Sequence, residues 1–293
     1  MDEILFPGFE RRRLPGDGIE IDAVVGGSGP PLLLLHGYPQ TRACWHKIAP
    51  RLAEQFTVVC PDLRGYGRSD KPRAEPGHES YSKRRMGRDQ IATMQALGFV
   101  NFFLAGHDRG ARVAYRLALD HPGAVRRLAV LDILPTAEVW RVMDAEQAQR
   151  SYHWQFLAQP SPLPETLIGA DPQFFLRWTL EAWAGPGFRF DPAALADYRY
   201  SFSNPATIRA SCEDYRAGWT ADRQIDEAEY GRFRIACPLL ILAGARYGVA
   251  KQNPEAVWRQ WADDVRYREV PGGHFLPEEA PVETVAALEE FFT

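Results

Sequence analysis

A carboxylate between two glycines is the first feature of this sequence that could do chemistry. Asp108 is the central residue of Gly106-His107-Asp108-Arg109-Gly110, where an apolar run ends and a helical pattern begins. This spacing is typical of a sharp strand-to-helix turn that projects a nucleophile, with glycines where side chains would clash. The helix start favours an ionised carboxylate, which could attack an electrophilic carbon and form an ester. The five residues alone fit equally well an aspartate that only caps the helix.

An ester intermediate needs a base that activates water, and His274 is the candidate. It stands on the glycine-rich turn 270–273, after the last strand candidate and before the C-terminal helical stretch. We predict that Asp132, at the end of an apolar run, orients His274. The loop 245–251 after the next strand holds no carboxylate, and Glu255 falls inside the following helical stretch. Nucleophile, acid and histidine then occur in the chain order of the α/β-hydrolases, with aspartate in place of serine.

Short uninterrupted apolar runs must position these residues. Five runs predict strands that are buried on both faces, at 31–37, 56–62, 101–106, 127–132 and 238–243. Helical patterns lie between or after them, at 89–97, 111–119, 254–261 and 277–292. This alternation is typical of a doubly wound, mostly parallel sheet. Two earlier segments, near 9–14 and 19–25, predict an antiparallel hairpin at the sheet edge.

The alternation is interrupted by a stretch rich in Trp, Tyr, Phe and Pro. Its patterning is helical over 139–156, 172–183 and 192–200. We interpret residues 136–212 as a helical cap inserted into a core made of residues 1–135 and 213–293. The predicted fold class is therefore α/β, an α/β-hydrolase fold with a mostly parallel doubly wound sheet and an inserted helical cap.

The bulk composition excludes several classes of protein. The chain has 293 residues, of which 45% are hydrophobic and 25% charged, as in ordinary globular proteins. A formal net charge of −4 gives no basic surface for nucleic acid. The longest apolar run, at 32–35, is far too short to span a membrane. The N-terminus lacks the basic start and apolar core of a secretion signal.

The four cysteines stand at unrelated spacings, without a CxxC pair. We therefore expect free, buried thiols in a reducing compartment and a cytoplasmic protein. The remaining histidines satisfy no metal-ligand spacing, so no metal site is predicted.

Taken together, these motifs resemble the fluoroacetate dehalogenases, a branch of the α/β-hydrolases, over nearly the whole chain. Residues 36–40 (HGYPQ) look like the family's HGFPQ turn, with Tyr38 for phenylalanine. Residues 62–67 (DLRGYG), 106–113 (GHDRGARV) and 131–136 (LDILPT) look like further family segments, as do 152–154 (YHW) and 214–218 (DYRAG) in the cap. The HGxP turn and the elbow are shared with epoxide hydrolases and haloalkane dehalogenases. HDRGAR combined with HW and DYRAG is more specific, and the loop after residue 244 matches least.

The resemblance implies that Arg109 and Arg112, one and four residues after Asp108, hold a substrate carboxylate by bidentate hydrogen bonds. The carbon next to that carboxylate would then lie in line with Asp108. Two surface arginines are the alternative, but arginine at a helix start opposes the helix dipole, so an anionic partner is expected.

The resemblance also implies groups that stabilise departing and developing charge. The departing halide would accept hydrogen bonds in a dry cap pocket from His153, Trp154 and Tyr215. The backbone N–H groups of Tyr38 and Arg109 would form the oxyanion hole. Core packing is the alternative for each aromatic residue taken singly.

We therefore expect a hydrolytic dehalogenase that converts haloacetates (fluoroacetate, chloroacetate) to glycolate through an ester on Asp108. The small anionic substrate is the expected partner. No metal or organic cofactor is required, and the resemblance implies a homodimer. An epoxide hydrolase that uses the same Asp-His-Asp groups is the alternative among enzymes. A catalytically silent binding protein on this fold is the alternative from another class.

Overall fold

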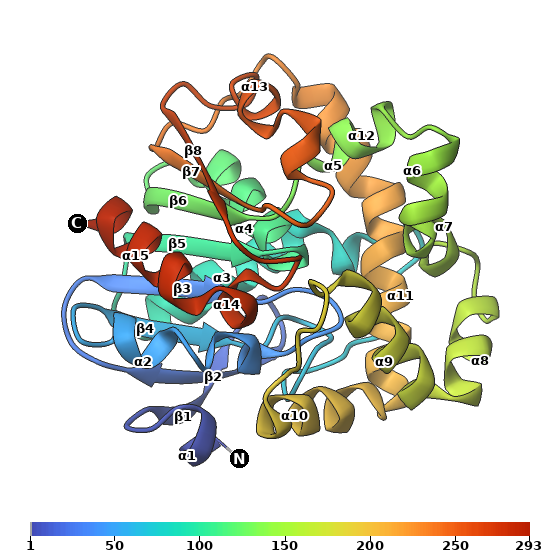
Figure 1. The fold of residues 1–293 in the computed structure, drawn as a ribbon, viewed down its shortest axis with the longest axis horizontal. Coiled ribbons are helices and arrows are strands. Elements are labelled where there is room, and N and C mark those ends of the chain that lie inside the picture. The colour runs from blue at the N-terminus through green and yellow to red at the C-terminus, as the bar shows by residue number, and fades with distance from the viewer. Residues whose placement is uncertain (1) are drawn as a thin grey trace.

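The computed structural model describes residues 2–293 and is built around one eight-stranded sheet (Figure 1). The strand order is β1-β2-β4-β3-β5-β6-β7-β8. β1, β2 and β4 pair antiparallel, and from β4 to β8 every neighbouring pair is parallel. The strands are β1 (Glu10–Pro15), β2 (Glu20–Gly26), β3 (Pro31–Leu35), β4 (Thr57–Pro61), β5 (Phe102–His107), β6 (Val125–Leu131), β7 (Leu239–Gly244) and β8 (Val265–Val270).

The five predicted apolar runs are confirmed as β3 to β7, the buried interior of the sheet. The predicted hairpin is confirmed too, since Leu14 of β1 pairs with Ile21 of β2. β8 was not among the five runs. Its sequence, VRYREV, is buried only at its two terminal valines because it is the other edge of the sheet.

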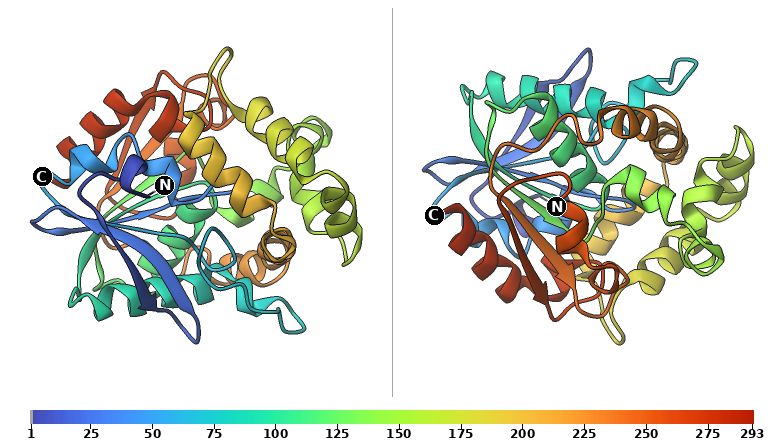
Figure 2. Two further views of the ribbon diagram at one scale, coloured as in Figure 1. Left: turned by 90° about the horizontal axis from the view of Figure 1, so that it is seen from below. Right: turned by 90° about the horizontal axis from the view of Figure 1, so that it is seen from above.

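Helices cover both faces of the sheet. α3 (Lys83–Ala96) and α4 (Arg109–Asp120) lie on one face, and α2 (Ala49–Leu52) and α15 (Pro281–Phe292) on the other (Figure 2). The predicted stretch 277–292 forms two helices, because Pro281 begins a new helix after α14. The remaining core helices are α1 (Asp2–Leu5), η1 (Arg42–Trp45), η2 (Glu79–Tyr81), η3 (Ala250–Gln252), α13 (Pro254–Trp258) and α14 (Leu276–Glu279).

The chain between β6 and β7 is mostly helical, as the sequence predicted for much of it, and lies beside one end of the sheet in Figure 1. Its helices are α5 (Thr136–Arg141), α6 (Ala145–Arg150), α7 (Tyr152–Leu157), α8 (Leu163–Ala170), α9 (Pro172–Trp183), α10 (Pro192–Phe202), α11 (Pro205–Trp219) and α12 (Ala221–Glu229). The predicted helical stretch 139–156 is divided among α5, α6 and α7. The predicted end of the cap at residue 212 falls inside α11, and the division into core and cap remains a prediction.

Some expectations concern the chain as a whole. All four cysteines are free and buried, as predicted. Among residues 2–293, no helix combines the length and the apolarity needed to cross a membrane. Nor do the side chains in this range form a cluster of three or more His, Cys, Asp or Glu groups that could hold a metal ion.

Candidate active site

The backbone at Asp108 has the strained geometry that the two glycines predicted. Asp108 lies between β5 and α4 with φ 49° and ψ −118°, a conformation that L side chains rarely adopt and that is typical of functional turns. A Cβ on Gly106 would lie 2.6 Å from Ala111 Cα, and one on Gly110 would lie 2.3 Å from the carbonyl oxygen of His36. The Asp108 side chain makes no capping hydrogen bond with α4. The alternative of a simple helix cap is therefore wrong.

The turn after β3 closes over this carboxylate. The backbone N–H of Tyr38 donates to Asp108 Oδ1 at 2.8 Å. A Cβ on Gly37 would lie 2.4 Å from Asp108 Cβ, so only glycine permits this approach. The other predicted oxyanion donor, the N–H of Arg109, is the first of α4 and has no partner within the helix by its position.

His274 lies between two carboxylates. Its Nε2 is 3.7 Å from Asp108 Oδ2, and its Nδ1 is 2.6 Å from Asp132 Oδ2. Asp132 is in turn fixed by the N–H of Gly244, which donates to its Oδ1 at 3.1 Å. Glu255 lies inside α13, as expected. The three side chains that the sequence grouped are therefore together, Asp108 and Asp132 at the carboxyl ends of β5 and β6 and His274 on the turn after β8.

The protonation of these groups follows from their contacts. Burial opposes a charged imidazole, but the hydrogen bonds and charges of Asp108 and Asp132 outweigh it and raise the pKa of His274 to about 9. Burial likewise opposes ionisation of Asp108, yet His274 holds the pKa of that carboxyl well below its usual value. The pKa of Asp132 is raised, because burial there exceeds the effect of its hydrogen bond with His274. At neutral pH the site thus holds an ionised Asp108 beside an imidazolium.

Arg109 is buried and already has an anionic partner inside the protein. Its Nε and Nη2 donate to the carboxylate of Asp214 on α11 at 3.1 and 2.6 Å, and Nη2 also donates to the Asp214 carbonyl at 2.7 Å. The guanidinium carbon lies 4.2 Å from the ring centre of Tyr215. Nη1 is buried without a hydrogen-bond partner. Arg109 therefore has only Nη1 free to donate to a substrate carboxylate. The resemblance implied a bidentate contact, in which two guanidinium nitrogens donate.

Arg112 is equally buried but has neutral neighbours. Its Nη1 donates to the carbonyl of Leu134 at 2.9 Å and to Thr136 Oγ1 at 3.1 Å, and its Nε has no partner. The guanidinium carbon lies 4.5 Å from the Trp154 ring centre. Among residues 2–293, no carboxylate comes within ion-pair distance of it, and Asp108 acts on it only at longer range. Burial, followed by the charge of Arg109, lowers the pKa of Arg112.

The three predicted cap donors lie next to one another and are all buried. The ring centres of His153 and Trp154, from α7, are 5.8 and 6.2 Å from that of Tyr215 on α11. His153 Nδ1 has no hydrogen-bond partner. Burial lowers the pKa of His153 to about 3, so its ring is neutral and carries one N–H. The halide-binding role of this cluster remains a prediction.

Sequence reasoning missed several side chains around the site. Lys83 and Arg109 both form a buried ion pair with the carboxylate of Asp214. Trp183 and Tyr247 place their rings against His274, with centres 5.5 and 4.7 Å away. Only Asp214 left a signal, as the first residue of the DYRAG segment that resembles the dehalogenase family.

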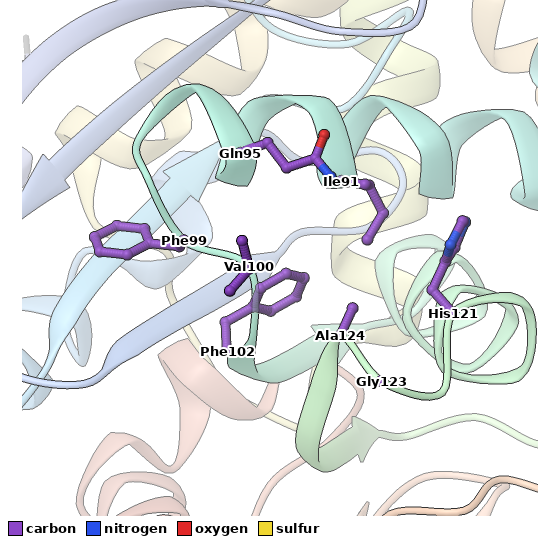
Figure 3. Close-up of a pocket in the computed structure, with 8 residues that line it drawn as sticks. All are labelled: Ile91, Gln95, Phe99, Val100, Phe102, His121, Gly123 and Ala124. Carbon is purple, nitrogen blue, oxygen red and sulfur yellow. The ribbon is translucent and has the colours of Figure 1, made fainter.

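The cavity drawn in Figure 3 lies away from these groups. It has a volume of about 250 Å³ and is lined by the ends of α3 and α4, including Ile91, Phe99 and His121. It also contacts Phe102, the first residue of β5, whereas Asp108 follows the last one. A larger groove of about 750 Å³ lies between α3 and α12. Neither contains a residue predicted for the site, whose side chains are packed inside the molecule.

Comparisons with known proteins agree with this geometry. Residues 30–281 match the family model of the α/β hydrolase fold. The chain is 46% identical to a fluoroacetate dehalogenase of Burkholderia sp. over 99% of this chain and 95% of the relative. It is 32% identical to a soluble epoxide hydrolase of Corynebacterium sp. (strain C12), over 94% of each chain. The crystal structure of a putative alpha/beta hydrolase from Nostoc sp PCC 7120 superposes with a TM-score of 0.95 at 52% identity, covering 97% of this chain and 98% of that one.

Proposed function

The chain belongs to the α/β-hydrolase fold family, and we propose that within it the protein is a hydrolytic dehalogenase that converts haloacetates to glycolate. The observation that carries this proposal is the buried guanidinium of Arg112, which has no acidic partner among residues 2–293 and lies one helical turn after the nucleophile. A buried cation of this kind costs several kcal/mol unless an anion joins it. A substrate carboxylate is such an anion.

In the first step, a carboxylate oxygen of Asp108 attacks the carbon that bears the halogen. The carbon–halogen bond breaks, the halide leaves with the bonding electrons, and an ester of glycolate with Asp108 forms. Arg112 and Nη1 of Arg109 hold the substrate carboxylate so that the carbon faces Asp108. The N–H of His153, with Trp154 and Tyr215, donates to the departing halide in a site from which water is excluded.

In the second step, His274 removes a proton from water, and the water oxygen attacks the ester carbonyl of Asp108. The bond between this carbonyl carbon and the glycolate oxygen then breaks, that oxygen takes the proton from His274, and glycolate leaves while the Asp108 carboxylate is restored. The pKa of His274 explains the order of events. Asp108 helps to raise that pKa to about 9, which keeps the imidazole protonated in the free enzyme. Once Asp108 is esterified its charge is gone, the pKa of His274 falls, and the imidazole becomes a base only when the ester is present. The N–H groups of Tyr38 and Arg109 stabilise the oxyanion.

An epoxide hydrolase is the second candidate, because the same Asp108–His274–Asp132 arrangement opens epoxides and a relative at 32% identity carries that name. A neutral epoxide, however, provides no partner for the cation of Arg112. The two candidates therefore differ in the charge of the substrate that the arginines accept.

Halide and diol release distinguish these functions. We would incubate the protein with fluoroacetate, chloroacetate, a chloroalkane and an epoxide, and we expect halide from the two acids. Diol without halide would replace the proposal by the epoxide hydrolase. Binding of chloroacetate with neither product would favour the silent binding protein.

The covalent step has its own test. His274→Asn cannot activate water, so chloroacetate should leave a glycolyl mass on the peptide that contains Asp108, measured by mass spectrometry. Asp108→Asn is the matched control and should stay unmodified. Halide release by the wild type with an unmodified peptide in His274→Asn would contradict the ester mechanism.

We also propose a cytoplasmic homodimer, on the support of the family resemblance and of an apolar patch on the cap. The apolar surface consists of two half-exposed pairs at i, i+4 spacing, Leu163 with Leu167 on α8 and Phe174 with Trp178 on the next helix, α9. Such patches are typical of interfaces between subunits. Light scattering should give a dimer mass for the wild type and a monomer mass for Trp178→Glu. A monomeric wild type would contradict the proposal.

A further inference from the structure

A buried cluster of charged side chains surrounds Asp214 and includes Arg109. The Asp214 carboxylate accepts hydrogen bonds from Arg109, from the hydroxyl of Tyr66 at 2.6 Å and from the ammonium of Lys83. Arg109, Tyr66 and Lys83 are each at most 1% exposed, and Asp214 is fully buried. One carboxylate thus joins α11 to the starts of α3 and α4 and to the loop after β4.

The charges of this cluster matter for an anionic substrate. Arg109 with Asp214 alone is a neutral pair, and a neutral pair attracts a carboxylate only weakly. Lys83 adds a second positive charge at the Asp214 carboxylate, so Arg109 does not have to neutralise that carboxylate alone. Asp222 competes for the same lysine, because its Oδ2 lies 3.4 Å from Lys83 Nζ and its Oδ1 accepts from the Lys83 N–H at 2.7 Å.

A purely structural explanation fits this cluster poorly. Removing an ammonium and a carboxylate from water costs several kcal/mol for each ion, and apolar side chains of the same volume often stabilise a fold as well or better. The cluster also holds Arg109 by Nε and Nη2 and so leaves Nη1 as its free donor.

Resting on the proposed function, we propose that Lys83 and Asp214 are positioning residues for substrate binding. Asp214 fixes the guanidinium of Arg109 with Nη1 available to the substrate carboxylate. Lys83 offsets the charge of Asp214, so that the arginine pair keeps its attraction for an anion. Neither residue touches the substrate.

The test compares Lys83→Met, Lys83→Arg and the control Arg84→Met, which removes a neighbouring cation that pairs with Asp120 and Glu229 instead. Glycolate binding is measured by calorimetry, and kcat and KM from chloride release with chloroacetate. Lys83→Met should raise the glycolate Kd and the KM about thirtyfold, the size of one charge acting across ~8 Å at an effective dielectric constant of about 20. Its kcat should change less than about threefold. Lys83→Arg should restore both constants to within about threefold, and Arg84→Met should change neither.

A fall in kcat with unchanged KM and Kd, or no change at all, would overturn the inference. If that happens while the wild type releases halide, the proposed function stands and only the role of Lys83 is lost. A wild type that neither releases halide nor binds glycolate would contradict both the proposed function and the proposed role of Lys83.

A second variant gives an effect of opposite sign and does not depend on Lys83→Met folding. Asp222→Asn keeps an oxygen that can accept from the Lys83 N–H but removes the competing charge. Lys83 then acts on Asp214 alone, and glycolate should bind about threefold more tightly. Unchanged or weaker binding would count against the proposal.

Discussion

Arg109 and Arg112 lie one turn apart on the same helix, and their surroundings differ in one essential respect. Arg109 is bound by the carboxylate of Asp214, which also forms an ion pair with Lys83. Arg112 is bound by a carbonyl and a hydroxyl, and its longer-range neighbour Asp108 loses its charge when the proposed ester forms. The free-energy cost of burying the guanidinium is therefore offset within the fold for Arg109, and only in part for Arg112.

This difference predicts that the two arginines affect the stability of the fold in different ways. An arginine that is paired inside the protein contributes to the fold, and its removal leaves an unpaired carboxylate. An arginine without an ionic partner is a cost to the fold, which a bound anion offsets. Two residues with the same side chain, burial and helix should thus respond to the same substitution with opposite changes in stability.

The largest effect is expected for Arg112→Met on activity. Methionine keeps the contact with Trp154 but removes the charge that receives the substrate, so kcat/KM for chloroacetate should fall about 1000-fold, or ~4 kcal/mol. The thermal unfolding temperature should be unchanged or higher. Chloride release and calorimetric unfolding measure the two quantities. A strongly destabilised Arg112→Met would mean that the protein itself, rather than the substrate, supplies the partner of this cation.

The opposite change in stability is expected for Arg109→Met. Asp214 would keep only Lys83 and Tyr66, and the free energy of unfolding should fall by about 3 kcal/mol, as is typical when one partner of a buried pair is removed. Denaturant unfolding of Arg109→Met and Arg112→Met in the same buffer makes the comparison direct. Equal losses in the two variants would show that the partners of the two arginines are energetically equivalent.

The contrast between the two arginines was not accessible from the sequence. The elbow around Asp108 was predicted because its glycines and its place between strand and helix are local features, and Asp132 followed from a loop without carboxylates. Asp214 is 105 positions from Arg109, and only the packing of α11 against α4 brings them together. The sequence therefore predicted an anionic partner for both arginines, whereas the described part of the chain supplies one for Arg109 and none within ion-pair distance of Arg112.

The same limit applies to the fold. Strands β3 to β7 were predicted because central strands are continuous apolar runs, while the edge strand β8 has charged residues and gave no such run. The cap was predicted as helical, but α11 passes through its predicted end at residue 212 because the helix packs on both parts. Periodicity reports which residues are buried, not which element buries them.

His274 extends the comparison to a third cation, one that has two carboxylate partners. Its folded pKa of about 9 exceeds the ordinary 6.5, so its pairing contributes fully below pH 6.5 and is lost as the pH rises through 9. The free energy of unfolding should fall by roughly 3 kcal/mol over that window.

Glu278 and Asp226 also have raised pKa values, of about 8 and 7, and titrate in the same direction. The measurement is therefore the wild type minus His274→Gln, from denaturant unfolding at pH 6.5 and 9. Parallel pH profiles of the two proteins would contradict the paired imidazolium.

The smallest effect is expected where a neutral partner of Arg112 is removed. Thr136→Val leaves the Leu134 carbonyl as the remaining acceptor, and the Arg112 guanidinium can then shift. KM for chloroacetate should rise about fivefold, equivalent to the ~1 kcal/mol of one hydrogen bond. Thr93→Val is the matched control, because Thr93 is a buried threonine whose hydroxyl donates to the carbonyl of Pro15 far from the site. It should lower stability by a similar amount and leave KM unchanged. Similar KM values in the two variants would mean that neutral hydrogen bonds do not position Arg112, and that its packing on Trp154 does.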